Sequence, residues 1–139
     1  MPSINKIRVD GTDYDIEPSQ THSSTEKVIG IWVDNKPIYE QVITFTKADI
    51  QALSLDSNNR RVLPYSNRNI DTLVDARFGL YTIENEVHGH LISNIGGGAY
   101  WDTTLYNVTD TYTELGIGPN MLDITINGFL VLQYTKTTD

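Results

Sequence analysis

The chain has 139 residues and a formal net charge of −8, from 18 Asp and Glu against 10 Lys and Arg side chains. This length is typical of one domain with one hydrophobic core. The negative charge disfavours a nucleic acid partner, because a surface that binds phosphate backbones is positive. The absence of cysteine excludes disulfides, thiol nucleophiles and cysteine-ligated zinc.

Membrane insertion is also disfavoured by the sequence. The opening segment, Met1 to Arg8, lacks the apolar run of a signal peptide. No uncharged apolar stretch reaches the roughly 20 residues that a spanning helix needs. We therefore expect a chain that is made in a cytoplasm and folds in water.

The first sixteen residues predict a β-hairpin. Asp10-Gly11 readily supplies the positive φ angles of a type I′ turn. The apolar residues that alternate on either side of it are Ile7, Val9, Tyr14 and Ile16. Residues 17–27 are polar and without periodicity, as in a linker. We expect a small unit at 1–16, a linker at 17–27 and the main domain at 28–139.

The next segments indicate two strands and one short helix. Residues 28–33 and 38–45 are rich in β-branched and aromatic side chains, and a tight turn would join them. Thr46, with Asp49 three residues later, resembles a capping box, so we expect a short helix within 46–55.

The remainder of the chain predicts short strands separated by turns. They are expected at about 62–65 and at 70–80, 81–95, 99–108, 121–126 and 129–134, with Asn127-Gly128 as a second hairpin signal. No βαβ alternation is visible, which disfavours a doubly wound fold. We therefore predict an all-β fold, an antiparallel β-sandwich of jelly-roll-like type, preceded by the hairpin and the linker.

One histidine pair has the spacing of a metal site. His88 and His90 would point to the same face of a strand and offer two imidazoles. Three chains around a threefold axis would bring six. Two exposed surface histidines explain the same pattern, since two ligands per chain are few for a metal.

Catalytic motifs are weak or absent. Glu84 and Glu86 share a strand face, so a carboxylate pair for glycoside hydrolysis can be imagined, but an acidic exposed face is the simpler explanation. There is no Gly-x-Ser-x-Gly elbow and no phosphate-binding Gly-x-x-x-x-Gly-Lys loop. We expect no enzymatic activity and no cofactor.

Aromatic residues gather in one later segment. They are Tyr100, Trp101, Tyr106 and Tyr112, and they lie close in sequence to Asp102, Asn107 and Asp110. Aromatic faces beside carboxylates and amides suit sugar rings, so these four residues form a possible glycan-binding set. Packing in the core or between subunits is the alternative, because half of the side chains of an alternating strand face inward.

Four blocks of sequence resemble small bacteriophage virion proteins. These blocks are Ile4 to Ile16, Ser24 to Tyr39, Asn69 to Asp75, and Leu132 to Asp139. The first resembles the leading hairpin of such proteins, and the second resembles the start of their globular domain, with Asn35 where glycine is usual. Residues 46–67 and 83–118 depart from the pattern, as expected for segments that recognise something variable.

The resemblance implies a non-enzymatic structural protein of the virion, assembled in the host cytoplasm. It would be a head fibre, decoration or tail fibre component, commonly a homotrimer, attached to other capsid or tail proteins through the N-terminal hairpin. It would also bind the host surface, for example a cell-surface glycan. The alternative is a carbohydrate-binding receptor-recognition module of a phage tail, whose principal partner is the ligand itself.

Overall fold

The computed structural model describes residues 6–15, 22–82, 90–93 and 98–137. The chain divides into two compact units. Unit 1 comprises Met1–Ile43, Arg68–Ala76 and Val131–Asp139, and unit 2 comprises Thr44–Asn67 and Arg77–Leu130. Each unit is therefore assembled from stretches that are far apart in sequence.

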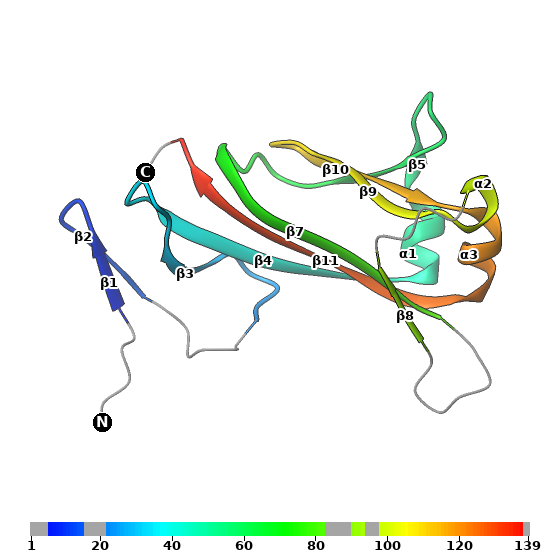
Figure 1. Ribbon diagram of the computed structural model, residues 1–139, viewed down its shortest axis with the longest axis horizontal. Coiled ribbons are helices and arrows are strands. Elements are labelled where there is room, and N and C mark those ends of the chain that lie inside the picture. Colours follow the sequence, from blue (N-terminus) through cyan, green and yellow to red (C-terminus); the bar gives the residue numbers. More distant parts are fainter. Residues whose placement is uncertain (1–5, 16–21, 83–89, 94–97, 138–139) are drawn as a thin grey trace. The chain divides into compact units, whose positions relative to one another are not determined.

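Three sheets hold the described strands (Figure 1). A two-stranded sheet pairs β1 (Lys6–Val9) with β2 (Thr12–Asp15). A four-stranded sheet has the order β5 (Ser54–Leu55), β6 (Arg61–Pro64), β10 (Tyr112–Ile117) and β9 (Thr103–Val108). A five-stranded sheet has the order β3 (Lys27–Ile31), β4 (Pro37–Thr46), β11 (Thr125–Lys136), β7 (Ile70–Thr82) and β8 (His90–Ser93).

The two larger sheets pack as a sandwich of antiparallel strands, so the predicted fold class is confirmed. The core of unit 2 includes Phe45 and Phe78, whose ring centroids are 6.1 Å apart, and the fully buried Leu80, Leu115 and Leu130. These apolar side chains hold the two layers together by removing their inner faces from water.

The predicted N-terminal hairpin is present. Ile7 lies opposite Tyr14, and Val9 opposite Thr12. The turn residues Asp10 and Gly11 both have positive φ, 49° and 81°, as a type I′ turn requires. Ile16, the fourth apolar residue of the predicted set, lies outside the described residues.

The predicted helix is also present, but it is shorter than expected. The helix α1 (Lys47–Ala52) begins after Thr46, whose hydroxyl accepts a hydrogen bond from the backbone N–H of Asp49, while the Asp49 carboxylate accepts one from the N–H of Thr46. This is the reciprocal capping box that the sequence indicated. The remaining Ser54 and Leu55 form β5 instead.

The second hairpin signal, Asn127-Gly128, was wrong. β11 runs through both residues without a turn. A Cβ at position 128 would collide with the ring of Phe45, the carbonyl oxygen of Gly79 and the side chain of Leu80. The glycine is therefore needed for close packing inside the sandwich, and not for a left-handed backbone.

Two short helices replace predicted strand residues. α2 (Gly98–Trp101) carries Tyr100 and Trp101, which were expected on a strand, and β9 begins only at Thr103. α3 (Pro119–Ile124) has proline at its first turn, where the missing N–H has no cost. β10, between them, was missed because Gly116 and Gly118 resembled turn signals.

The described part of the predicted linker bonds to β4. The carbonyl of Ser23 accepts a hydrogen bond from the N–H of Val42 at 2.8 Å, and Nδ1 of His22 lies 2.6 Å from the carboxylate of Glu40. Residues 17–21 of the same segment lie outside the described residues. No helix in the described ranges has the length and hydropathy needed to cross a bilayer.

Candidate functional site

Unit 2 contains a cleft with a volume of about 520 Å³. Three segments line it. The β5–β6 segment contributes Leu55, Asn58, Asn59, Arg60 and Arg61, the β9 side contributes Asp102 and Tyr106, and the β10–α3 side contributes Gly116, Ile117, Gly118, Pro119 and Leu122. This volume lies within the range of about 300–1,000 Å³ that is usual for small-molecule sites.

The loop between β5 and β6 is fixed by its own side chains. The Asp56 carboxylate accepts hydrogen bonds from the backbone N–H groups of Asn58, at 2.8 Å, and Arg60, at 3.0 Å. These bonds, that of Arg60 first, lower the pKa of Asp56 because they favour the ionised form. Asn59 has a φ of 59°, which asparagine tolerates better than most residues. The loop therefore presents Arg60 in one position.

Arg60 lies over the ring of Tyr106. Its guanidinium carbon is 3.7 Å from the ring centroid, and its Nη1 is 3.4 Å from an oxygen of Glu114. A cation held over an aromatic face in this way is attracted by the negative face of the ring. The pair forms one wall of the cleft.

A β-bulge positions Tyr106. Asn107 is opposite Glu114, but Leu105 is opposite Leu115, so Tyr106 is the extra residue on β9. Bulges turn a side chain away from the regular alternation and are frequent beside functional sites. The bulge therefore explains how Tyr106 reaches Arg60 from its strand.

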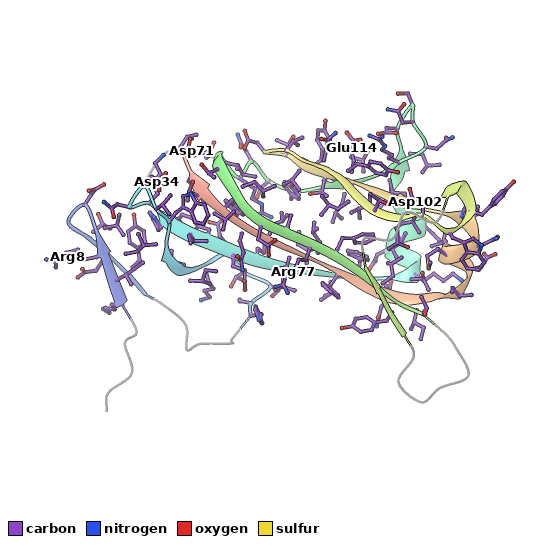
Figure 2. All side chains as sticks on the ribbon, in the orientation of Figure 1. Arg8, Asp34, Asp71, Arg77, Asp102 and Glu114 are labelled. Atoms are coloured by element: carbon purple, nitrogen blue, oxygen red, sulfur yellow. The ribbon has the colours of Figure 1, made fainter. Side chains whose placement is uncertain are left out.

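Asp102, labelled in Figure 2, lines the cleft beside Tyr106. Its carboxylate accepts a hydrogen bond from the hydroxyl of Thr104, at 2.5 Å, and one from the hydroxyl of Tyr106, at 2.8 Å. The bond to Asp102 raises the pKa of Tyr106, with further contributions from burial and from the carboxylate charge. The phenol therefore stays protonated to a higher pH than an ordinary tyrosine and continues to orient Asp102.

Two glycines allow these close approaches. A Cβ at Gly116 would collide with the Asp102 carboxylate and with the ring of Tyr106, and a Cβ at Gly118 would collide with the backbone of Tyr100 and Trp101. The backbone N–H of Gly118 also donates to the carbonyl of Asp102 at 2.9 Å. Both glycines are thus required where β9, β10 and α2 meet at the cleft.

The four residues of the predicted glycan-binding set do not all meet here. Tyr106 lines the cleft, and Tyr100 and Trp101 are 65% and 45% exposed on α2, whose backbone lies against Gly118. Tyr112 does not line the cleft: it begins β10 opposite Pro64, and its carbonyl accepts a hydrogen bond from the Tyr65 hydroxyl at 2.8 Å. The sequence analysis did not identify Arg60. The turn-forming residues from Asp56 to Asn59, which precede it, do indicate an ordered loop at this place.

The predicted particle anchor is the β1–β2 hairpin. Ile7 and Tyr14 are half-buried and Val9 is buried, while Arg8 and Asp13 form an exposed ion pair at 2.8 Å on the other face. No third strand among the described residues joins this two-stranded sheet. Each strand therefore has one outer edge that can pair with another chain.

The predicted metal pair lies largely outside the described residues. His88 falls within 83–89, and His90 begins β8 without a described side chain. Glu84 and Glu86 fall in the same segment. Within the ranges that the structure describes, no group of three or more His, Asp or Glu side chains could hold a metal ion.

A second polar cluster lies in unit 1. The Glu26 carboxylate accepts hydrogen bonds from the hydroxyl of the fully buried Tyr134 and from the ammonium of Lys136. Lys36 forms an ion pair with Asp71 at 2.6 Å. These contacts join segments from the beginning, middle and end of the chain.

The chain was compared with models of protein families, with curated proteins and with solved structures, and none of these comparisons finds a match.

Proposed function

We propose that this chain is a structural protein of a bacteriophage virion. It is a surface-exposed head fibre, decoration or tail fibre component with no enzymatic activity, and unit 2 binds the host surface. Support comes from the four blocks of sequence that resemble small phage virion proteins.

One observation carries this proposal: the resembling blocks contact one another within unit 1. Glu26 of the second block bonds to Tyr134 and Lys136 of the last. Lys36 of the second block pairs with Asp71 of the third. The first block contributes β2, which contacts β3 of the second. The four blocks that resemble phage virion proteins therefore lie in one compact unit, as expected if those proteins share the structure of unit 1.

The segments that depart from the resemblance, 46–67 and 83–118, belong to unit 2. The cleft is built entirely from this unit. This arrangement supports the proposed division of roles, in which unit 1 attaches to the particle and unit 2 carries the variable recognition surface.

Attachment through the hairpin has a simple physical basis. A two-stranded sheet is at best marginally stable alone, and its edges can join a neighbouring sheet through backbone hydrogen bonds. Such pairing depends little on the partner's side chains.

Removal of residues 1–16 tests the attachment. The truncated chain should remain folded, because its cores are retained, but it should be absent from purified particles. A finer comparison changes Ile7 and Tyr14 to Asp on the apolar face, or Arg8 and Asp13 to Ala on the polar face. Only the first pair should reduce incorporation. Normal incorporation of the truncated chain contradicts the assignment.

The proposed assembly is a homotrimer. Light scattering of the purified chain should give a mass near three times 15.6 kDa, and a monomer at micromolar concentration would contradict it. In a trimer, elemental analysis also tests the His88 and His90 pair: less than about one metal ion per trimer excludes a six-nitrogen site.

The second candidate function is a carbohydrate-binding receptor-recognition module. The cleft beside Arg60 and Tyr106 is the observation that favours it. If particle attachment fails the test above while selective sugar binding is found, this second function replaces the first.

A further inference from the structure

We propose that the cleft of unit 2 binds a short neutral oligosaccharide through Arg60, Asp102 and Tyr106. The inference rests on the proposed function, because it names the class of host-surface ligand that unit 2 recognises.

The charges of the cleft favour a neutral ligand. Arg60, Arg61 and Asp102 all line the cleft, so its lining carries both positive and negative groups, and Glu114 already contacts Arg60. A phosphate or carboxylate would meet the Asp102 carboxylate, and a cation would meet the two arginines. Hydroxyl groups both donate and accept hydrogen bonds, so a sugar can bond to the arginines and to the carboxylate.

The Asp102 carboxylate is already oriented to accept hydrogen bonds from hydroxyl groups. Each of its oxygens accepts a hydrogen bond from a hydroxyl of the chain itself, one from Thr104 and one from Tyr106. These bonds fix the carboxylate plane, and each oxygen keeps capacity for one more donor. A group that is already oriented loses little entropy when a ligand binds.

The apolar part of the lining suits the apolar faces of sugar rings. It contains Leu55, Ile117, Pro119 and Leu122. Tyr106 remains 40% exposed although the Arg60 guanidinium lies over its ring. These two stacked planar groups give the cleft a flat border. Ring C–H groups can pack on such surfaces while the hydroxyls turn to the polar side.

The aromatic turn of α2 extends this surface. The backbone of Tyr100 and Trp101 lies against Gly118, which lines the cleft, and both side chains are exposed. Exposed aromatic rings beside a cleft offer a place for a second sugar unit. We therefore expect trisaccharides to bind better than the corresponding monosaccharides.

The test uses the full purified chain and defined probes. Neutral trisaccharides of glucose, galactose, mannose and N-acetylglucosamine are compared with trigalacturonic acid and inorganic phosphate by saturation-transfer NMR, then by calorimetry. At least one neutral trisaccharide should bind more tightly than the acidic trisaccharide and phosphate. Asp102→Asn and Arg60→Gln should each weaken it about tenfold or more.

Asp123→Asn is the matched control, because it removes the same charge from an exposed residue of α3 that does not line the cleft. It should leave affinity unchanged. Should Asp102→Asn not fold, Arg60→Gln and the amide shifts of Asn58 and Gly116 on titration of the wild type still locate the site.

Three results overturn the inference: no binding of any neutral trisaccharide, preference for the acidic trisaccharide or phosphate, or binding that survives both cleft substitutions. Failure here is distinguishable from failure of the virion role. Incorporation of Asp102→Asn into particles should be normal in every case, since the anchor hairpin is unchanged.

Discussion

The hydroxyl of Tyr134 donates a hydrogen bond to the carboxylate of Glu26, 108 positions earlier in the chain. The ammonium of Lys136 contacts the other oxygen of the same carboxylate at 2.5 Å, and it also lies 4.4 Å from the ring centroid of Tyr39. Tyr39 in turn stacks on Tyr134, with centroids 6.2 Å apart. One carboxylate, directly before β3, therefore bonds to two residues near the end of β11. Its loss should lower the stability of unit 1.

Glu26→Gln should destabilise the protein by about 1–3 kcal/mol in urea unfolding, because the amide cannot neutralise Lys136 and only one of its atoms accepts a hydrogen bond. The control is Asp13→Asn, which removes an ion pair whose two side chains, Arg8 and Asp13, are 69% and 52% exposed. That change should have little measurable effect. Equal losses in the two variants would contradict a special role for Glu26.

Alkaline pH should weaken the same cluster. Burial first, and then the bond and the charge of Glu26, raise the pKa of Tyr134 above its ordinary value. Above about pH 10 the unfolded chain loses a proton that the folded chain keeps, so the contribution of this group to stability falls as pH rises.

Urea unfolding of the wild type and of Tyr134→Phe at a series of pH values measures this effect. The wild type should be the more stable near neutrality, and the difference should shrink from about pH 10 upward. A difference that is constant up to about pH 11.5 would show that Tyr134 does not titrate in this way.

Gly128→Ala should destabilise the sandwich by about 1–3 kcal/mol, because the added methyl group must displace Phe45, Leu80 or the Gly79 carbonyl. Gly30→Ala is the comparison, since a Cβ there has no heavy atom within 4 Å. That variant should be neutral or slightly more stable. Thermal unfolding of the two variants checks the prediction, and equal melting temperatures would refute it.

The loop of Arg60 should be sensitive to acid. The pKa of Asp56 is lowered from its ordinary 3.8 by bonds from the backbone N–H of Arg60 and then of Asn58. The ionised carboxylate therefore supports the loop above that ordinary value, and the support disappears as pH falls through the folded-state pKa. NMR titration should place the Asp56 carboxyl below 3.8.

Substitutions of Asp56 distinguish the effect of its hydrogen-bond acceptor from the effect of its negative charge. Asp56→Asn keeps an oxygen that can accept both backbone bonds, so amide exchange at Asn58 and Arg60 should remain slow. Asp56→Ala removes the acceptor and should speed exchange at both amides. Identical exchange in the two variants would mean that the side chain does not hold the loop.

Local signals predicted the parts of the fold that depend on neighbouring residues. Asp10-Gly11 and the Thr46–Asp49 pair act within four positions, and both the hairpin and the helix cap are present. Asn127-Gly128 failed because the requirement for glycine comes from Phe45 and Leu80, which approach from other strands. No local pattern contains that information.

The cleft was predictable only in part for the same reason. Tyr106 stood out by its aromatic neighbours in sequence, but its contact with Arg60 depends on how β9 and β10 are aligned at the bulge. The expected strand over 99–108 failed where α2 packs on Gly118. Short-range periodicity indicates which face of a strand is buried, but it does not indicate which other strand pairs with it or where a bulge lies.

The division into two units has a consequence for how this chain can be re-engineered. Unit 2 consists of residues 44–67 and 77–130, and three of its four junctions with unit 1 fall inside β4, β7 and β11. A shift of one residue at any of these three junctions would turn inward side chains outward along the rest of the strand. To transfer another binding specificity to this chain, residues 44–67 and 77–130 must therefore be exchanged together, with the strand register kept at each junction.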